Sequence, residues 1–445
     1  RMLLRMKKPE EALPLLKRHI SAVPADAAAP ALQLEVAASF LDAGNAAQAA
    51  EEYQHYLETF SDKPGLAEAF RGKGWALLLL PKPPYEEAAA AFRRAYELFG
   101  HAEPGARCLV KAADCLFSNT QFGLAAEIYE KALKEFPDSP LALQVRFQTA
   151  ECAARAGKPD DAEKLFRGLL EANPPGSLAE QALLRIARIK EDRGDLVAAL
   201  AAHEQFLAAY TNSALAPDSL LAHGLINFHL LRFETALADF EKLVSAFSNA
   251  PPVEQARYMQ GRCLQIVGPE DKAIGVWRDF LKGYPPTSRW APHVLFRLAE
   301  YDFNRGDFAG AEKQFSDLAA KYPEDGLAPS ALLNAGQSAA KRKEYAQARE
   351  CFSAMIKKYP SSPLIPNARY EQGDASTELG EYANAVLIFE EIIEKYSGSD
   401  LLDNAWCRKA DCEFALGVDD SKRYESAIVS YKVVAAGPSA PLKRG

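Results

Sequence analysis

The sequence predicts an all-α solenoid of about twelve helix–turn–helix repeats, of which the first is truncated. Three observations lead to this prediction. A period of about 37 residues runs along the whole chain, small and aromatic residues return at fixed places in each period, and apolar residues follow helical rather than alternating spacing. Self-similarity at a fixed period of about 20 to 50 residues is typical of such arrays.

An aromatic residue closes nearly every repeat. The repeats end near residues 23, 60, 99, 136, 173, 210, 247, 284, 322, 359, 396 and 438. Most spacings are 37 residues, although Phe60 and Phe99 are 39 apart and the last repeat contains the insertion VDDSKR. Because the period is uninterrupted, residues 1–445 are expected to form a single solenoid.

Each repeat is expected to contain a helix A, a tight turn, a helix B and a short joint. Eleven residues before each repeat end stands Ala, and seven before it stands a ring in nearly every repeat, as at Ala348 and Phe352. Residues four apart share one helical face, so this pair predicts the buried side of helix B. A small residue on helix A, such as Gly336 or Gly373, should let the two helices approach.

The helix ends also have a signature. Gly recurs sixteen residues before the repeat end, at Gly44, Gly157, Gly194, Gly268, Gly306 and Gly380, where it should supply the left-handed residue that ends helix A. Pro360 should stop helix B, because proline cannot continue the hydrogen-bond ladder. Ser362 and Pro363 then suggest an N-cap and a first-turn proline for the next helix A.

These columns resemble the tetratricopeptide repeat (TPR) family, above all in the segments GEYANAVLIFEEIIEKY and KEYAQARECFSAMIKKYP. The resemblance implies a right-handed superhelical solenoid whose concave face is formed mainly by A helices. The family's usual period is about 34 residues. The longer joints here, of the YPSSPLI type, resemble a bacterial cell-envelope branch that includes β-barrel assembly lipoproteins and coordinators of the Tol–Pal system. That resemblance implies a periplasmic or outer-membrane-associated protein, with a cytoplasmic one as the alternative.

The resemblance also implies partner-binding positions. In the family the groove is lined by helix-A residues three before and one after the small residue. Carried onto this chain, the first set is Phe147, Tyr258, Phe296, Leu333 and Tyr370, and the second includes Arg262, Glu300, Gln337 and Asp374. Rings and mixed charges suit an extended peptide or a partner helix. The alternative is that each ring merely packs against the next A helix. Lys and Asn of a carboxylate clamp are missing here, which argues against a co-chaperone.

Motifs for catalysis, cofactors or metals are not found in the sequence. The seven Cys form no CxxC pair, and Cys115, Cys152, Cys263 and Cys412 share one repeat position, which predicts buried thiols. His203 replaces a column ring and is expected in the core. The net charge of −8 argues against a dedicated nucleic-acid binder, and no apolar run approaches the roughly 18 to 20 residues of a membrane span.

The leading hypothesis is therefore a non-catalytic scaffold that binds partner proteins or peptides along its concave helix-A face, in a bacterial envelope or secretion assembly and without a cofactor. The chain begins within a repeat, with RMLLRMKK, as a fragment of a longer protein would. One alternative is thus the sensor or targeting arm of a larger enzyme. A second is a carbohydrate-export component, which rests on family analogy alone.

Overall fold

The computed structural model describes residues 2–6, 8–23 and 26–435, which form 24 helices joined by turns and contain no strand. In chain order the helices are Met2–Arg5 (α1), Pro9–Ala22 (α2), Ala29–Asp42 (α3), Ala46–Thr59 (α4), Leu66–Leu78 (α5), Tyr85–Phe99 (α6), Glu103–Ser118 (α7), Phe122–Glu135 (α8), Ala142–Arg155 (α9), Pro159–Glu171 (α10), Gly176–Asp192 (α11), Leu196–Ala209 (α12), Ala216–His229 (α13), Phe233–Ala246 (α14), Val253–Val267 (α15), Glu270–Gly283 (α16), Ala291–Asn304 (α17), Phe308–Lys321 (α18), Ala328–Lys341 (α19), Tyr345–Lys358 (α20), Ile365–Glu378 (α21), Tyr382–Lys395 (α22), Leu402–Leu416 (α23) and Lys422–Ala435 (α24). The all-helical fold class is confirmed, and from α3 onward odd-numbered helices are A helices and even-numbered ones are B helices.

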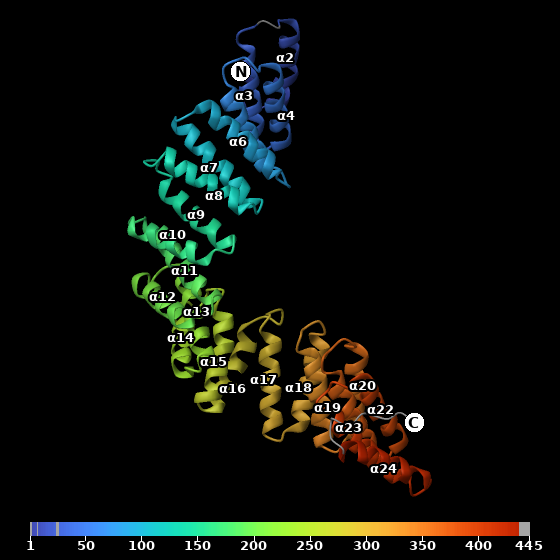
Figure 1. Cartoon of the computed structure of the whole chain (residues 1–445). Coiled ribbons are helices and arrows are strands. Elements are labelled where there is room, and N and C mark those ends of the chain that lie inside the picture. The colour runs from blue at the N-terminus through green and yellow to red at the C-terminus, as the bar shows by residue number, and fades with distance from the viewer. Residues whose placement is uncertain (1, 7, 24–25, 436–445) are drawn as a thin grey trace. The chain divides into compact units, whose positions relative to one another are not determined.

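The contacts divide the chain into two compact parts, an N-terminal half, Arg1–Ile226, and a C-terminal half, Asn227–Gly445. The division falls inside α13. Within each half, helices that follow one another in sequence pack side by side (Figure 1). A helices of neighbouring repeats also touch, as α9 and α11 do in the first half and α19 and α21 in the second. That residues 1–445 form one solenoid stays a prediction.

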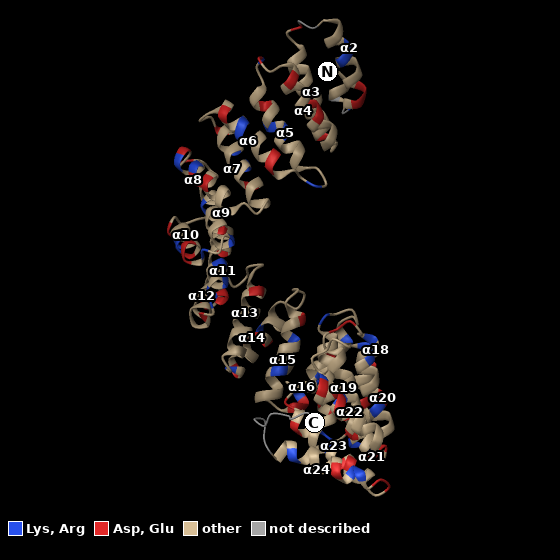
Figure 2. Cartoon of the chain, turned by 45° about the vertical axis from the view of Figure 1, so that its right-hand side comes forward, with Lys and Arg blue, Asp and Glu red and all other residues tan. Residues whose placement is uncertain are grey.

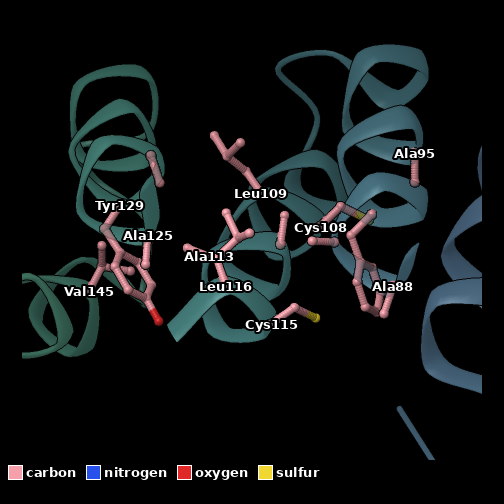
Figure 3. Packing of buried hydrophobic residues seen from close by; sticks show 14 of the residues in the cluster. Ala88, Ala95, Cys108, Leu109, Ala113, Cys115, Leu116, Ala125, Tyr129 and Val145 are labelled. Atoms are coloured by element: carbon pink, nitrogen blue, oxygen red, sulfur yellow. The ribbon is translucent and has the colours of Figure 1, made fainter. Parts of the chain in front are cut away.

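The core of each repeat is the ring of helix B, held between the A helix of its own repeat and its neighbours. From Tyr53 to Phe389 the column ring is at most 5% exposed, and the Ala four residues before it is also buried. In the cluster of Figure 3, Tyr129 and Ala125 of α8 lie beside Val145 of α9. In the last described repeat Tyr431 is 39% exposed, because no further described helix covers α24.

Most A helices end on a left-handed residue, as the Gly column predicts. Gly44, Gly157, Gly194, Gly306 and Gly380 have φ between 74° and 84°. The same place in other repeats is taken by Thr120, Leu231 and Lys343, with φ of 59° to 64°. In each case the N–H of the next residue bonds back to the last turn, as Glu344 N–H donates to the Ala339 carbonyl at 3.0 Å. Orphan carbonyls of the helix end are thereby satisfied.

Gly268 corrects the prediction for this column. Its φ is −115° and its ψ −178°, an extended conformation open to any residue. The reason is the next residue, Pro269, because a residue that precedes proline is pushed out of the helical region toward extended backbone. The Gly column therefore marks the turn in this repeat without ending the helix in left-handed geometry.

Leu231→Gly is expected to raise the free energy of unfolding by up to about 1 kcal/mol. A non-Gly residue in left-handed geometry costs about 1–2 kcal/mol, which the change to Gly removes. Part of this stabilisation is offset, because Gly loses more conformational entropy on folding than Leu does. Leu231 is 72% exposed, so little packing is lost. The reverse change, Gly306→Ala in the same half, should lower stability, since Gly306 has φ +84°. Urea unfolding of both variants is the measurement; a less stable Leu231→Gly would contradict the strain argument.

The serine of the joint does not cap helix A, contrary to the prediction. Ser362 Oγ accepts the Leu364 N–H at 3.2 Å, and the helix begins only at Ile365. The same arrangement recurs at Ser139 with Leu141. A hydroxyl bonded two residues ahead forms a serine turn, which bends the chain before the helix starts. The joint is also fixed from behind, because Tyr359 Oη donates to the Pro323 carbonyl of the preceding joint at 2.9 Å.

Two further expectations about buried groups are confirmed. Cys115, Cys152, Cys263 and Cys412 are free thiols, each at most 1% exposed. Burial raises the pKa of the Cys152 thiol to about 12, which keeps it protonated and unreactive. His203 is fully buried, with its ring nitrogens bonded to Ser219 and Glu191 at 2.8 and 2.7 Å.

Candidate functional site

The candidate site is the A-helix face, which we define as the side chains three residues before and one residue after the close-packed small residue of each helix A. The apolar positions predicted on this face are mostly buried. Phe147, Tyr258, Phe296 and Leu333 are 6–8% exposed. Phe147 packs edge-on against Phe166 with ring centroids 5.3 Å apart, and Phe296 and Tyr370 pack in the same way against the column rings of their own repeats.

Tyr258 is held differently from the other rings. It stacks on Trp290 of the following repeat with ring centroids 5.0 Å apart, and its carbonyl accepts the Trp277 indole N–H at 3.2 Å. The rings of Phe147, Phe296 and Tyr370 thus meet the B helix of their own repeat, and only Tyr258 has a ring contact with the next repeat, as the alternative considered for the rings would require. A partner could reach only their edges. Their role in binding stays a prediction.

The polar positions of the face are half-buried and have mixed surroundings. Glu300 accepts from Arg297 of its own helix at 2.6 Å. Arg262 lies 5.7 Å above the Phe228 ring, and its Nε is buried without an acceptor among the described residues. A buried N–H without a partner costs about 1–3 kcal/mol. This Nε is enclosed by the protein, so a partner on the surface could reach only the outer nitrogens of Arg262.

Gln337 and Asp374 belong to a series of contacts that the sequence analysis did not foresee. The residue one after the small position of a repeat pairs with the residue two before the small position of the next repeat, 34 residues later. Gln337 donates to Glu371 at 2.9 Å, Arg408 donates to Asp374 at 2.6 Å, and in the N-terminal half Arg185 forms a bidentate ion pair with Glu151. We call these contacts the A-helix ladder, because each one ties an A helix to the next.

The ladder makes stability depend on pH at Glu371. Burial raises the pKa of this carboxyl, although the bond from Gln337 acts in the opposite direction. A carboxyl whose pKa is raised in the folded state destabilises it while ionised, and this effect disappears as the pH falls through the raised pKa. Glu371→Gln should therefore be more stable than the parent near pH 7, with the advantage lost toward about pH 4.

Thermal unfolding of Glu371→Gln over this pH range checks the prediction. Glu350→Gln, which alters an exposed glutamate of α20 in the same half, is the matched control. An equal stability difference at every pH would contradict the assignment of the effect to ionisation of Glu371.

The N-terminal half has a pocket of about 570 Å³ on its A-helix face, built by α5, α7 and α9. Its lining residues are Arg71, Trp75, Phe92, Glu103, Pro104, Arg107, Cys108, Val110, Lys111, Asp114, Leu141, Gln144, Val145 and Gln148. Phe92, Cys108 and Val145 form a buried floor. Trp75 is 39% exposed and meets Phe92 edge-on, with ring centroids 5.7 Å apart. We call this the α5–α9 pocket.

The pocket was missed because its first helix lies out of phase. The turn between α5 and α6 carries the two residues that lengthen the spacing from Phe60 to Phe99 to 39. The small residue that faces the ring is consequently Gly74, whose added Cβ would lie 2.8 Å from Phe92. Arg71 and Trp75 then occupy the positions three before and one after it. The 39-residue spacing from Phe60 to Phe99 was the signal in the sequence that could have placed Arg71 and Trp75 on this face.

Metal clusters and membrane-spanning helices are two other features that would leave a mark in the described part of the chain, and neither is found there. Among residues 2–6, 8–23 and 26–435, no group of three or more His, Cys, Asp or Glu is placed to hold a metal ion. None of the described helices combines the length and apolar character needed to cross a membrane. Basic and acidic residues are interspersed on the helices of both halves, without a block of one sign (Figure 2).

The arrangement defines a class of protein: an array of helical hairpins in which consecutive helices pack side by side within each half. Part of this array matches tetratricopeptide repeats. The tetratricopeptide repeat family model matches residues 110–177, 296–363 and 333–400, in both halves. No curated protein sequence matches the chain.

Several solved structures have a similar fold. The C-terminal part of a TPR repeat-containing protein from Cytophaga hutchinsonii is 16% identical with a TM-score of 0.47, over 58% of this chain and 96% of that one. A structure of Naa15/Naa10 bound to HypK-THB is 15% identical with a TM-score of 0.42, over 96% of this chain and 66% of that one. PilW, a type IV pilus biogenesis factor, is 19% identical with a TM-score of 0.39, over 52% of this chain and 99% of that one. Such low values do not extend the functions of these proteins to this chain.

Proposed function

We propose that this chain is a non-catalytic scaffold that binds segments of partner proteins on its A-helix face. The observation that supports the proposal best is the α5–α9 pocket, where a partly exposed Trp75 meets the buried ring of Phe92 on that face. Tetratricopeptide repeats commonly serve as protein-binding scaffolds, because stacked helices present one extended surface. In the C-terminal half, Arg262 is the predicted basic residue of this face and is half-buried.

We further propose that the partners belong to a bacterial envelope or secretion assembly. Support comes from the 37-residue period and from joints such as residues 359–365, where a serine turn and a tyrosine–carbonyl bond give the extra residues a defined structure. Fractionation of cells that make the full-length protein tests this part. Recovery in the cytoplasm alone would contradict it without affecting the binding proposal.

Site-directed photocrosslinking in the source organism tests the binding surface. A photoreactive residue is placed at Arg107 or Gln144, which are exposed on the A helices α7 and α9. The matched controls are Val197 of α12 and Leu387 of α22, exposed positions on B helices at 67% and 65%. We expect discrete crosslinked proteins from the A-helix positions and few from the B-helix positions. Crosslinks confined to the B-helix positions would overturn the proposed surface.

A further inference from the structure

Some polar side chains of the α5–α9 pocket have hydrogen-bond or ion-pair partners in the protein, and others do not. Both lining carboxylates already have partners: Glu103 accepts from Arg107 at 2.5 Å, and Asp114 accepts from Lys111 at 2.6 Å and from Tyr129 Oη at 2.5 Å. Arg71, in contrast, pairs with no carboxylate among the described residues and lies 5.5 Å above the Phe99 ring. Since three lining bases face two lining acids, the uncompensated charge of the pocket is positive.

Two amides and an indole beside this charge also lack partners. Gln144 and Gln148 of α9 make no hydrogen bond to the described residues, and neither does the indole N–H of Trp75. An amide side chain can both donate to and accept from a peptide backbone. The unused groups therefore match a backbone that passes through the pocket rather than a compact ion.

Trp75 has an unusual side chain for its place in the repeat. The equivalent position carries Asp114, Glu151, Gln337 or Asp374 in other repeats, and three of these four hold the A-helix ladder. Trp75 instead keeps 39% of its surface open, in a pocket whose lining also includes Val110 and the buried Val145. Lys111 Nζ lies 5.5 Å above its ring, which leaves the rest of the indole for an apolar contact. Aromatic side chains are favoured anchors at protein interfaces.

We propose that the α5–α9 pocket binds an extended segment of a partner protein in which a large apolar residue is followed by Glu or Asp. The apolar side chain lies on Trp75 and Val110, the carboxylate pairs with Arg71, and Gln144 and Gln148 bond the backbone. A planar guanidinium suits a carboxylate, because it can form two parallel hydrogen bonds. This inference rests on the proposed function and names the chemistry of the partner.

A basic segment fits the same pocket less well. To pair with Glu103 or Asp114 it would have to displace Arg107 or Lys111 from contacts of 2.5 and 2.6 Å, and it would meet the unpaired Arg71. Like charges brought together at an interface cost binding energy. The commitment is to a side-chain carboxylate within the segment, and a terminal carboxylate is a separate outcome of the test.

Fluorescence anisotropy with the whole chain tests the proposal. The probe is the labelled peptide Gly-Ser-Phe-Glu-Ser-Gly with an amidated C-terminus. We expect saturable binding that weakens about tenfold or more when Glu is replaced by Gln, or Phe by Ala, in the peptide, as the usual strength of a charged hydrogen bond or an aromatic anchor implies. Equal binding of all three peptides would overturn the proposal. Binding that requires a free C-terminal carboxylate would overturn the choice of a side-chain carboxylate.

Variants of the protein locate the binding. Arg71→Gln and Trp75→Ala should each weaken binding of the Phe-Glu peptide about tenfold or more. Trp75→Phe should restore part of it. Arg146→Gln, which removes the same charge from an exposed arginine of α9 outside the pocket, should leave binding unchanged. Thermal unfolding of each variant separates lost binding from lost folding. Full binding by a folded Arg71→Gln would overturn the assignment.

The photocrosslinking experiment keeps this inference distinct from the proposed function. If photoreactive residues at the positions of Arg107 and Gln144 crosslink to a protein but the Phe-Glu peptide does not bind, the proposed binding surface is supported and the proposed ligand chemistry is wrong. If neither result is obtained, the proposed function fails as well.

Discussion

Gly336→Leu is expected to lower the free energy of unfolding by about 3 kcal/mol, near the upper end of the usual cost of overpacking a core. A Cβ at Gly336 would lie 2.4 Å from Cε1 of the Phe352 ring, which is fully buried. That ring belongs to the B helix of the same repeat and is enclosed by its neighbours, so it has no free space to move into. Helices α19 and α20 must therefore separate.

The control for this variant is Gly275→Leu in α16 of the same half. No atom lies within 4 Å of a Cβ added there, and the position is exposed. Because Leu favours helix over Gly by about 0.8 kcal/mol, this variant should gain stability. Urea unfolding combined with amide exchange in α19–α21 measures the pair, since each repeat contacts only its neighbours. Parent-like stability of Gly336→Leu would mean that the small position does not set the helix spacing.

Arg185→Met is expected to cost about 3 kcal/mol, because it leaves the Glu151 carboxylate buried without its ion-pair partner. Glu151 is 6% exposed and receives both arms of the guanidinium. The same contact raises the pKa of Arg185 further above its ordinary value. The loss arises from an uncompensated buried charge, and not from the contact energy alone.

A double-mutant cycle separates these two causes. Glu151→Met with Arg185→Met removes both charges, and replacing a buried pair by apolar residues is commonly neutral or stabilising. The double variant should therefore recover most of the stability lost in Arg185→Met, as measured by urea unfolding. A double variant as unstable as the single one would show that packing of the Arg185 stem matters more than its charge.

The sequence predicted the fold well because burial repeats with the period. The positions of Ala348 and Phe352 are filled by Ala and by a ring in nearly every repeat. Because these positions are buried in nearly every repeat, they keep the same residue types and make the period visible in the sequence. Local turns were harder to predict. Ser362 could cap a helix or form a turn with its own chain, and only the backbone of the joint decides between them. Gly268 was misjudged because Pro269 dominates its conformation.

The candidate site was less predictable than the fold. A family position such as that of Phe147 identifies which way a residue points along helix A, but the exposed area left there depends on the ring of helix B that packs against it. Tyr258 loses its exposure to a tryptophan of the next repeat, which no single-repeat pattern contains. Trp75 keeps its exposure because a two-residue insertion displaces the column. Departures from the period were thus more informative about the site than the period itself.

The A-helix ladder has a consequence for the order of the repeats. Its contacts differ in chemistry: acid with base at Glu151 and Arg185, amide with acid at Gln337 and Glu371, acid with base at Asp374 and Arg408. A repeat that supplies Glu371, if moved behind the repeat that carries Glu151, would bring two carboxylates together, of which Glu151 is buried. Shuffling, deleting or duplicating single repeats is therefore constrained by charge wherever a ladder contact joins two repeats. At the junctions that have a ladder contact, charge thus limits which repeats can follow one another.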